Sequence, residues 1–154
     1  MAPEDRRTRA RPGVLLAIGV GGALGSAARY EVALALPREA GGFPWATFLV
    51  NVTGALALGL IATLVIERWP PSQYVRPFAA IGVCGGYTTW STFMTDTVLL
   101  VREHRAAVAG VYLAATLGCG LSATVAGIAL GRLWPVARRR GADLDLQPEP
   151  VSAG

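Results

Sequence analysis

The sequence is poor in charged residues, and this scarcity argues against a soluble enzyme. Asp, Glu, Lys and Arg make up 16% of the 154 residues, against roughly a quarter in ordinary soluble domains. Apolar residues make up 53%, and the mean hydropathy is +0.45. A soluble domain of this size could not bury so much apolar surface, because small domains keep a large fraction of their surface exposed. The composition therefore predicts a membrane protein.

Histidine, cysteine and lysine are also scarce. Histidine occurs once, cysteine twice and lysine not at all, so all 14 basic residues are arginines. Cys84 and Cys119 lie in apolar stretches, where a free cysteine behaves as a small hydrophobic residue. Two cysteines predict neither a disulfide framework nor a metal cluster. Because the sequence also offers no serine–histidine arrangement, we expect a protein that is not an enzyme.

Four long stretches carry few or no charges. Each is long enough to cross a hydrocarbon core as a helix. A helix is the expected structure because backbone polar groups in lipid must form their hydrogen bonds within the chain. The connectors between the stretches are short, which makes neighbouring helices antiparallel. We therefore expect an all-α integral membrane protein with a membrane domain over residues 13–135 and with spans near 14–36, 46–66, 78–101 and 106–131.

The two ends of the chain are basic. Residues 1–12 are expected to form a basic N-terminal tail, and residues 136–154 a disordered C-terminal tail. With four helices, ten arginines lie on the side of the termini and three on the other, so the positive-inside rule places both termini in the cytoplasm. Arg138–Arg140 is interpreted as an anchor at an anionic bilayer rather than a nucleic-acid contact. A signal peptide at residues 6–28 is the alternative for the first span, which we expect to be retained.

The third span has a high density of polar and aromatic residues. Residues 85–93 read Gly-Gly-Tyr-Thr-Thr-Trp-Ser-Thr-Phe. A Gly-Gly pair invites a break in a helix, and Ser and Thr can satisfy the freed backbone groups. Non-helical backbone at membrane depth is tolerated only inside protein or beside a water-filled cavity. We therefore favour a functional break over helix packing by small residues.

A few polar residues lie inside the other predicted spans. Asn51 needs a hydrogen-bond partner, either in a functional site or between helices. Arg29 is an intramembrane charge, which we predict to face the bundle interior. Asp96 is expected instead to lie near a helix end and to extend to the membrane interface. The glycine-rich residues 19–25 do not fit a dinucleotide-binding loop and are interpreted as a tight helix contact.

Taken together, these strings resemble the Fluc/CrcB family of fluoride channels. Residues 22–25 followed by Arg29-Tyr30 are similar to the first-helix signature of the family, and residues 43–51 to its second helix. Residues 85–93 resemble the third-helix signature Gly-Gly-x-Thr-Thr-Phe-Ser-Thr-Phe, and Tyr112 falls where the family has a fourth-helix tyrosine. The resemblance covers roughly residues 14–132.

The resemblance implies passive export of fluoride across a bacterial plasma membrane by a four-helix subunit with a broken third helix, working as an antiparallel dimer. It implies a structural sodium ion at the dimer centre, held by the backbone carbonyls of Gly85 and Thr88. The implied partners are fluoride, the lipid bilayer and a second subunit, with no nucleic acid. The implied fluoride pathway consists of Asn51, the aromatic residues Trp90 and Phe93, and the hydroxyl-bearing residues Thr47, Ser91, Thr92, Tyr112 and Thr116.

The chain departs from the family pattern in ways that leave alternatives open. Trp90 stands where a phenylalanine is usual, and Gly120 where a serine is often found. The bias of ten arginines to three suggests one orientation, so our hypothesis is a heterodimer with an oppositely oriented paralogue, with a homodimer as the alternative. A small proton-coupled multidrug exporter has the same size but depends on a glutamate deep in its first helix, whereas Glu31 comes late. A non-transporting scaffold subunit is the third possibility.

Overall fold

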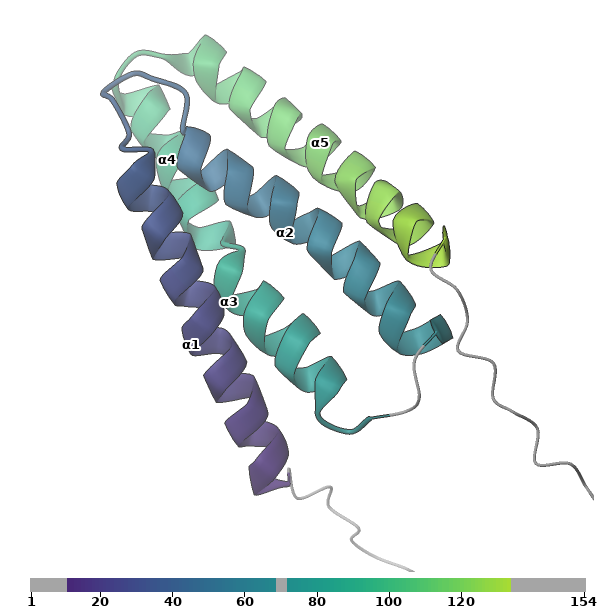
Figure 1. Cartoon of the computed structure of the whole chain (residues 1–154). Coiled ribbons are helices and arrows are strands. Elements are labelled where there is room, and N and C mark those ends of the chain that lie inside the picture. Colours follow the sequence, from purple (N-terminus) through teal and green to yellow (C-terminus); the bar gives the residue numbers. More distant parts are fainter. Residues whose placement is uncertain (1–10, 69–71, 134–154) are drawn as a thin grey trace, which may run out of the picture.

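The computed structural model describes residues 11–68 and 72–133, and over these residues it contains helices and no strand (Figure 1). Most of the two predicted tails lies outside the described residues. The elements are α1 (Pro12–Ala35), α2 (Trp45–Thr63), η1 (Leu64–Arg68), η2 (Pro77–Cys84), α3 (Gly85–Tyr87), α4 (Trp90–Arg102) and α5 (Ala106–Leu133). The π-helical segment η1 directly continues α2, and η2, also π-helical, leads directly into α3.

Three of these helices are long and apolar enough to cross a membrane. They are α1 with 24 residues, α2 with 19 and α5 with 28. At a rise of 1.5 Å per residue, even the shortest approaches the roughly 30 Å thickness of a hydrocarbon core. This confirms the prediction of an all-helical membrane protein. The remaining predicted span is not one continuous helix, because η2 and α3 together are separated from α4 by two non-helical residues.

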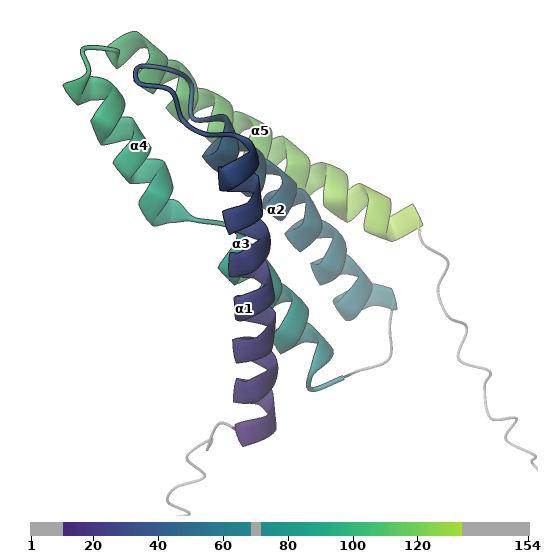
Figure 2. The ribbon, with the colours of Figure 1, turned by 60° about the vertical axis from the view of Figure 1, so that its left-hand side comes forward.

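The helices run alternately up and down and form two closely packed pairs (Figure 1). α2 lies along α5, and α1 lies along η2 and α3. α4 then leaves the line of α3 and packs against α5, so the link between α3 and α4 crosses the middle of the bundle (Figure 2). The fold therefore places the interruption of the third span where the two pairs meet, and its freed backbone groups can contact other helices there.

Glycines allow each pair of helices to approach closely. A Cβ atom added at Gly25 of α1 would lie 2.2 Å from the carbonyl oxygen of Val83, and one at Gly127 of α5 would lie 2.2 Å from that of Leu56. Neither position can hold a side chain unless a helix moves, because these neighbours are backbone atoms. Small residues at such contacts are the usual means of tight helix packing in membranes. This confirms the interpretation of residues 19–25 as a helix contact.

Gly25→Ala is expected to destabilise the fold. The new methyl group would push α1 away from η2, and overpacking of this kind costs about 1–3 kcal/mol. Gly19→Ala is the matched control, because a Cβ at Gly19 of the same helix would meet nothing within 4 Å. Thermal unfolding of both variants in detergent would test this. Equal midpoints for the two variants would contradict the proposed contact.

Candidate functional site

The interruption of the third span lies at Thr88 and Thr89. Both residues have extended backbone, with ψ angles of 158° and 121°. The preceding glycine pair, to which the sequence analysis attached the break, remains helical. Gly86 instead serves packing, since a Cβ there would lie 2.4 Å from the carbonyl oxygen of Gly22 in α1. The break therefore lies at the hydroxyl-bearing residues Thr88 and Thr89 and not at the glycine pair.

Asn51 of α2 holds the broken backbone through both ends of its amide. Its Nδ2 donates to the carbonyl oxygen of Thr89 at 3.0 Å, and its Oδ1 accepts from the Thr89 N–H at 2.9 Å. The side chain thus supplies an acceptor for the N–H of Thr89 and a donor for its carbonyl at the break. A primary amide has two N–H donors, so one remains for another acceptor.

Thr89 also caps the helix that follows it. Its Oγ1 accepts from the N–H of Thr92 at 3.2 Å, and the hydroxyl of Thr92 lies 3.0 Å from the same atom. A threonine just before the first helical turn is a preferred N-cap, because its oxygen satisfies one of the free N–H groups there. The sequence analysis assigned Thr89 no separate role, although the spacing of Thr89 and Thr92 is the signal that could have identified the cap.

Arg29 extends from α1 toward the end of α3. Its Nη1 makes a long contact of 3.5 Å with the carbonyl oxygen of Thr88, and Ser26 Oγ makes one of the same length with that of Gly86. The last carbonyls of a helix lack intrahelical partners and carry partial negative charge, which a guanidinium stabilises. Arg29 is half-buried and lies against the end of α3, so its charge can stabilise this helix terminus.

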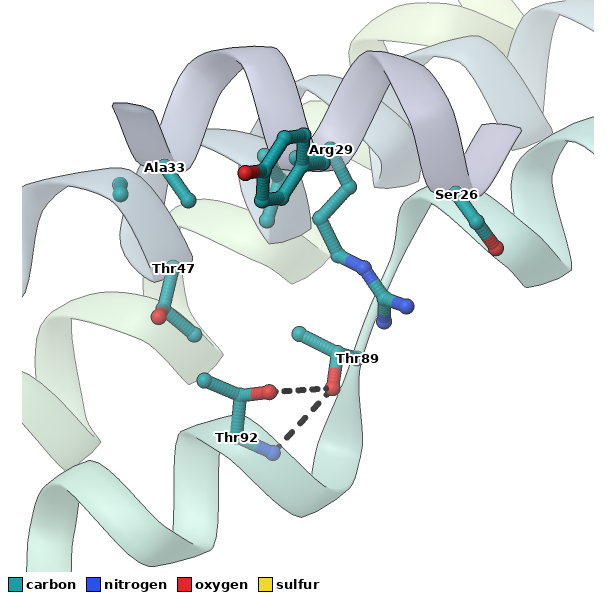
Figure 3. A pocket seen from close by; sticks show the side chains of 9 residues that line it. Ser26, Arg29, Ala33, Thr47, Thr89 and Thr92 are labelled. Atoms are coloured by element: carbon teal, nitrogen blue, oxygen red, sulfur yellow. Dashed lines mark hydrogen bonds between the residues drawn. The ribbon is translucent and has the colours of Figure 1, made fainter. Parts of the chain in front are cut away.

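A pocket of about 410 Å³ opens beside the break, between α1, α2 and the start of α4. Figure 3 shows the guanidinium of Arg29 reaching into it toward Thr89, with Thr47 and Thr92 on the far side. The pocket is lined by Ser26, Arg29, Tyr30, Ala33, Ala46, Thr47, Val50, Thr89 and Thr92. Its lining combines one cation with five hydroxyl-bearing residues and no carboxylate, a set of groups suited to a small anion.

A second pocket, of about 300 Å³, lies between α2, α4 and α5. Its lining includes Asn51, Trp90, Phe93, Thr116 and Gly120. Because Thr89 lines both pockets, they meet at the break. The two predicted pathway aromatics differ in burial, since the Trp90 side chain is 67% exposed and that of Phe93 is 1% exposed.

Phe93 is one of a series of aromatic rings that runs into the bundle. Its ring lies 5.3 Å from that of Trp90 and 5.1 Å from that of Tyr112, centroid to centroid, both in tilted arrangements. Phe43 meets Tyr112 edge-on at 5.3 Å and 88°. Tilted rings present their positively polarised edges to neighbouring groups, so such a series can face an anion without carrying a charge.

Buried polar groups adjoin these rings. The hydroxyl of Thr47 donates to Asp96 Oδ2 at 2.7 Å, and both residues are buried. The hydroxyl oxygens of Tyr112 and Thr116 are buried and have no hydrogen-bond partner within the described residues. Buried polar atoms of this kind are rare in proteins and call for an explanation such as a water molecule or an ion.

The expectation that Asp96 reaches the membrane interface is wrong. α4 continues to Arg102, so Asp96 lies in the interior of the helix rather than at its end. It faces α2, where Thr47 is its hydrogen-bond partner, and it is only 8% exposed. In the sequence Asp96 lies near the end of an apolar run, but in the structure it packs inward against α2.

Most of the predicted site residues are thus brought together around the break. Ser91 is exposed, and its hydroxyl lies 3.3 Å from that of Thr89. Gly85 is also exposed, on the helix that ends at the break. Ser26 was not predicted as a lining residue, nor Asp96 as an interior one. No sequence signal identified either, because both depend on how the helices pack.

Several known proteins are similar to this chain in sequence. The family model described as CrcB-like protein, Camphor Resistance (CrcB), matches residues 16–128. The chain is 49% identical over 133 residues to a protein named fluoride-specific ion channel FluC 3 from Streptomyces avermitilis, which covers 86% of this chain and 65% of that protein. It is 44% identical over 120 residues to fluoride-specific ion channel FluC 1 from Nitrobacter hamburgensis, covering 77% of this chain and 95% of that protein.

A further relative, fluoride-specific ion channel FluC from Chlorobaculum tepidum, is 42% identical over 120 residues, which is 78% of this chain and 95% of that protein. The family match begins in α1 and ends in α5, so it includes the break and both pockets. With three apolar helices, the chain is a multi-pass membrane protein. By this match and these identities, it belongs to the CrcB-like family.

Proposed function

We propose that this chain forms a fluoride-selective channel that lowers cytoplasmic fluoride by passive export of the anion. The observation that carries the proposal is the helix break, where an arginine and several hydroxyl groups from three helices surround a pocket without a carboxylate. The fluoride-specific channels among its relatives support the choice of ion. Neither a multidrug exporter nor a scaffold subunit is favoured by any feature of the site, and Glu31 is exposed rather than placed in the pocket.

The lining of the two pockets suits fluoride physically. The ion is small and strongly hydrated, so a pathway must replace its water with hydrogen-bond donors. Hydroxyl and amide groups donate, and ring edges add weak positive potential. Conduction also requires several weak sites rather than one tight site. The pathway that we propose consists of Thr47, Asn51, Trp90, Ser91, Thr92, Phe93, Tyr112 and Thr116, with Arg29 as the nearby fixed cation.

The driving force needs no coupled reaction. Hydrogen fluoride crosses the membrane as a neutral acid and ionises in the more alkaline interior. A negative interior then favours exit of the anion by about 2.3 kcal/mol per 100 mV. The protein therefore acts as a channel and not as an enzyme.

We propose that the chain works in an antiparallel dimer, with η2, α3 and α4 as a broken third membrane span. Large apolar side chains are exposed on α1 and α5, where lipid or a second subunit would cover them. The arginine bias is the reason to consider one fixed orientation with both termini in the cytoplasm of a bacterial inner membrane. An oppositely oriented paralogue would then complete the dimer, whereas a homodimer requires insertion in both directions.

A structural sodium ion at the dimer centre fits the chemistry of the proposed ligands. Sodium is a hard cation, and the carbonyls of Gly85 and Thr88 are oxygen donors near a helix C-terminus, where partial negative charge accumulates. Gly85 is exposed on the same segment, and a Cβ there would meet nothing within 4 Å, so this part of the helix is open to a second subunit. The ion would neutralise these carbonyls and join the two broken helices.

Fluoride efflux from liposomes tests the proposed function. The purified chain is reconstituted alone, and release is followed with a fluoride electrode and a chloride electrode. We expect release of fluoride and not of chloride, because only the smaller ion fits a pathway built from closely spaced donors. Equal release of both ions would contradict fluoride selectivity.

The same assay separates the two forms of dimer. Efflux from the chain alone would establish an antiparallel homodimer and refute the heterodimer. Efflux that appears only on reconstitution with an oppositely oriented paralogue would support the heterodimer. Absence of fluoride release under both conditions would refute the channel itself.

A further inference from the structure

A third cavity, of about 180 Å³, lies where α1, α2 and α4 approach the connecting loops. It adjoins the pocket beside the break, because Ala33, Ala46, Thr47 and Thr92 line both. The two cavities therefore lead from the helix break toward the end of the bundle that carries the α1–α2 and α4–α5 connections (Figure 1). This loop-end cavity is lined by two charged side chains, Arg38 and Asp96.

The carboxylate in this cavity is an obstacle to an anion. Asp96 is buried, and the group that donates a hydrogen bond to it is the neutral hydroxyl of Thr47. A buried carboxylate that is not compensated repels a passing anion strongly, since charges interact over longer distances where water is excluded. An anion route through the loop-end cavity therefore requires a positive charge close to Asp96.

Arg38 supplies that charge from the loop after α1. Its Nη2 pairs with Glu103 Oε2 at 2.8 Å, and the same oxygen accepts from the N–H of Gly41 at 2.8 Å. These two contacts tie the α1–α2 loop to the end of α4 and fix where the guanidinium lies. The Nε atom of Arg38 is buried and has no hydrogen-bond partner within the described residues. Glu103 thus pairs with Nη2 of the Arg38 guanidinium, and the Nε–H donor remains available.

Arg38 and Asp96 act on the same part of the interior. The two side chains carry opposite charges and line the same cavity. The Arg38 side chain is 23% exposed and that of Glu103 is 30% exposed, whereas Asp96 is 8% exposed. Water therefore screens the pair at the loops more than it screens Asp96. The carboxylate that most needs compensation is the one inside the cavity.

We propose that Arg38 is the counter-charge of Asp96, and that this compensation makes the loop-end cavity passable to an anion. The inference rests on the proposed fluoride channel and extends it by a residue outside the pathway at the break. Arg38 acts through Asp96 and is a positioning and electrostatic residue rather than a ligand that must bind fluoride itself.

A double-mutant cycle tests the compensation. Arg38→Gln is expected to lower fluoride efflux roughly tenfold in the parent chain, because it leaves Asp96 uncompensated. In the Asp96→Asn background, the same substitution is expected to change efflux less than about twofold, because no carboxylate remains. Arg105→Gln is the matched control: it removes a positive charge from the same loops, but Arg105 does not line the cavity. We expect it to leave efflux unchanged.

The outcomes separate compensation from a role in tying the loops together. If Arg38→Gln costs as much efflux in the Asp96→Asn background as in the parent chain, the proposal is overturned. It is also overturned if Glu103→Gln rather than Asp96→Asn removes the effect, since Arg38 would then serve only the loop contact. A loss with Arg105→Gln equal to that with Arg38→Gln would show a general effect of charge and would refute a local role.

Thermal unfolding of the same purified variants gives a readout that does not need transport. Arg38→Gln is expected to lower the unfolding midpoint in the parent chain and much less in the Asp96→Asn background. If the parent chain passes no fluoride but shows this coupling, the channel function fails and the Arg38–Asp96 compensation stands. If the unfolding midpoints show no coupling, the compensation fails whatever the transport result.

Discussion

Asn51→Ala is expected to abolish fluoride efflux. The amide of Asn51 contacts both the N–H and the carbonyl of Thr89, at 2.9 Å and 3.0 Å, and so fixes the break to α2. Leaving a buried backbone N–H without a partner costs about 1–3 kcal/mol, and the Thr89 carbonyl would lose its contact with α2 as well. The start of α4 would shift, and the two pockets that meet at Thr89 would lose their shape.

Liposome efflux and thermal unfolding of Asn51→Ala would be measured beside those of Thr63→Val. Thr63 lies on the same helix and is buried, but its hydroxyl donates to the carbonyl of Gly59 in its own helix. The control variant should therefore keep both efflux and stability. Efflux from Asn51→Ala at the level of the parent chain would refute the role of Asn51 at the break.

Asn51→Asp separates support of the break from a direct role toward the anion. The carboxylate can still accept from the N–H of Thr89, so much of the fold should be kept. It loses the Nδ2 donor and adds a negative charge beside the pathway, and efflux should fall although the protein remains folded.

Phe93→Ile is expected to abolish efflux while leaving the protein folded. Isoleucine keeps the apolar character of this 1% exposed position but has no ring. The tilted contacts of the Phe93 ring with Trp90 and Tyr112 would both be lost, and with them the positively polarised ring edges at the second pocket. An aliphatic side chain cannot replace the interactions that a strongly hydrated anion loses when it sheds its water.

The matched control for this substitution is Leu100→Val. Leu100 belongs to the same buried cluster as Phe93 and is 0% exposed, but it lines none of the three pockets described above. Both variants remove packing, at a cost of about 1–3 kcal/mol, so similar unfolding midpoints are expected. Efflux in Phe93→Ile equal to that of the parent chain would refute the assigned aromatic role.

The helical membrane architecture was predictable from the sequence because it depends on quantities that a sequence carries directly. A span needs only sufficient length and apolar character, and α1, α2 and α5 have both. The glycines of residues 19–25 were interpretable as a helix contact for the same reason, since small side chains in an apolar run have few other uses. The density of polar residues in the third span likewise predicted that its helix would be interrupted.

Other features depended on contacts between distant residues. The glycine pair at 85–86 suggested the break, yet it stays helical because Gly86 packs against Gly22, and the break moves to Thr88 and Thr89. Asp96 looked like a residue at a helix end, yet Thr47, 49 positions earlier in the chain, holds it inside. Neither the position of the break nor the burial of Asp96 could be predicted from the local sequence pattern.

The sequence by itself thus determined the class of protein, the number of apolar stretches and the residue types available to an anion. The tertiary structure alone decided which of those residues meet: Asn51 with Thr89, Arg29 with the end of α3, and Arg38 with Asp96 in one cavity. The physical reason is that apolarity is a property of each residue, whereas the partner of a buried polar group is a property of a packed pair. In a bundle closed by glycine contacts, small differences in helix position choose that partner.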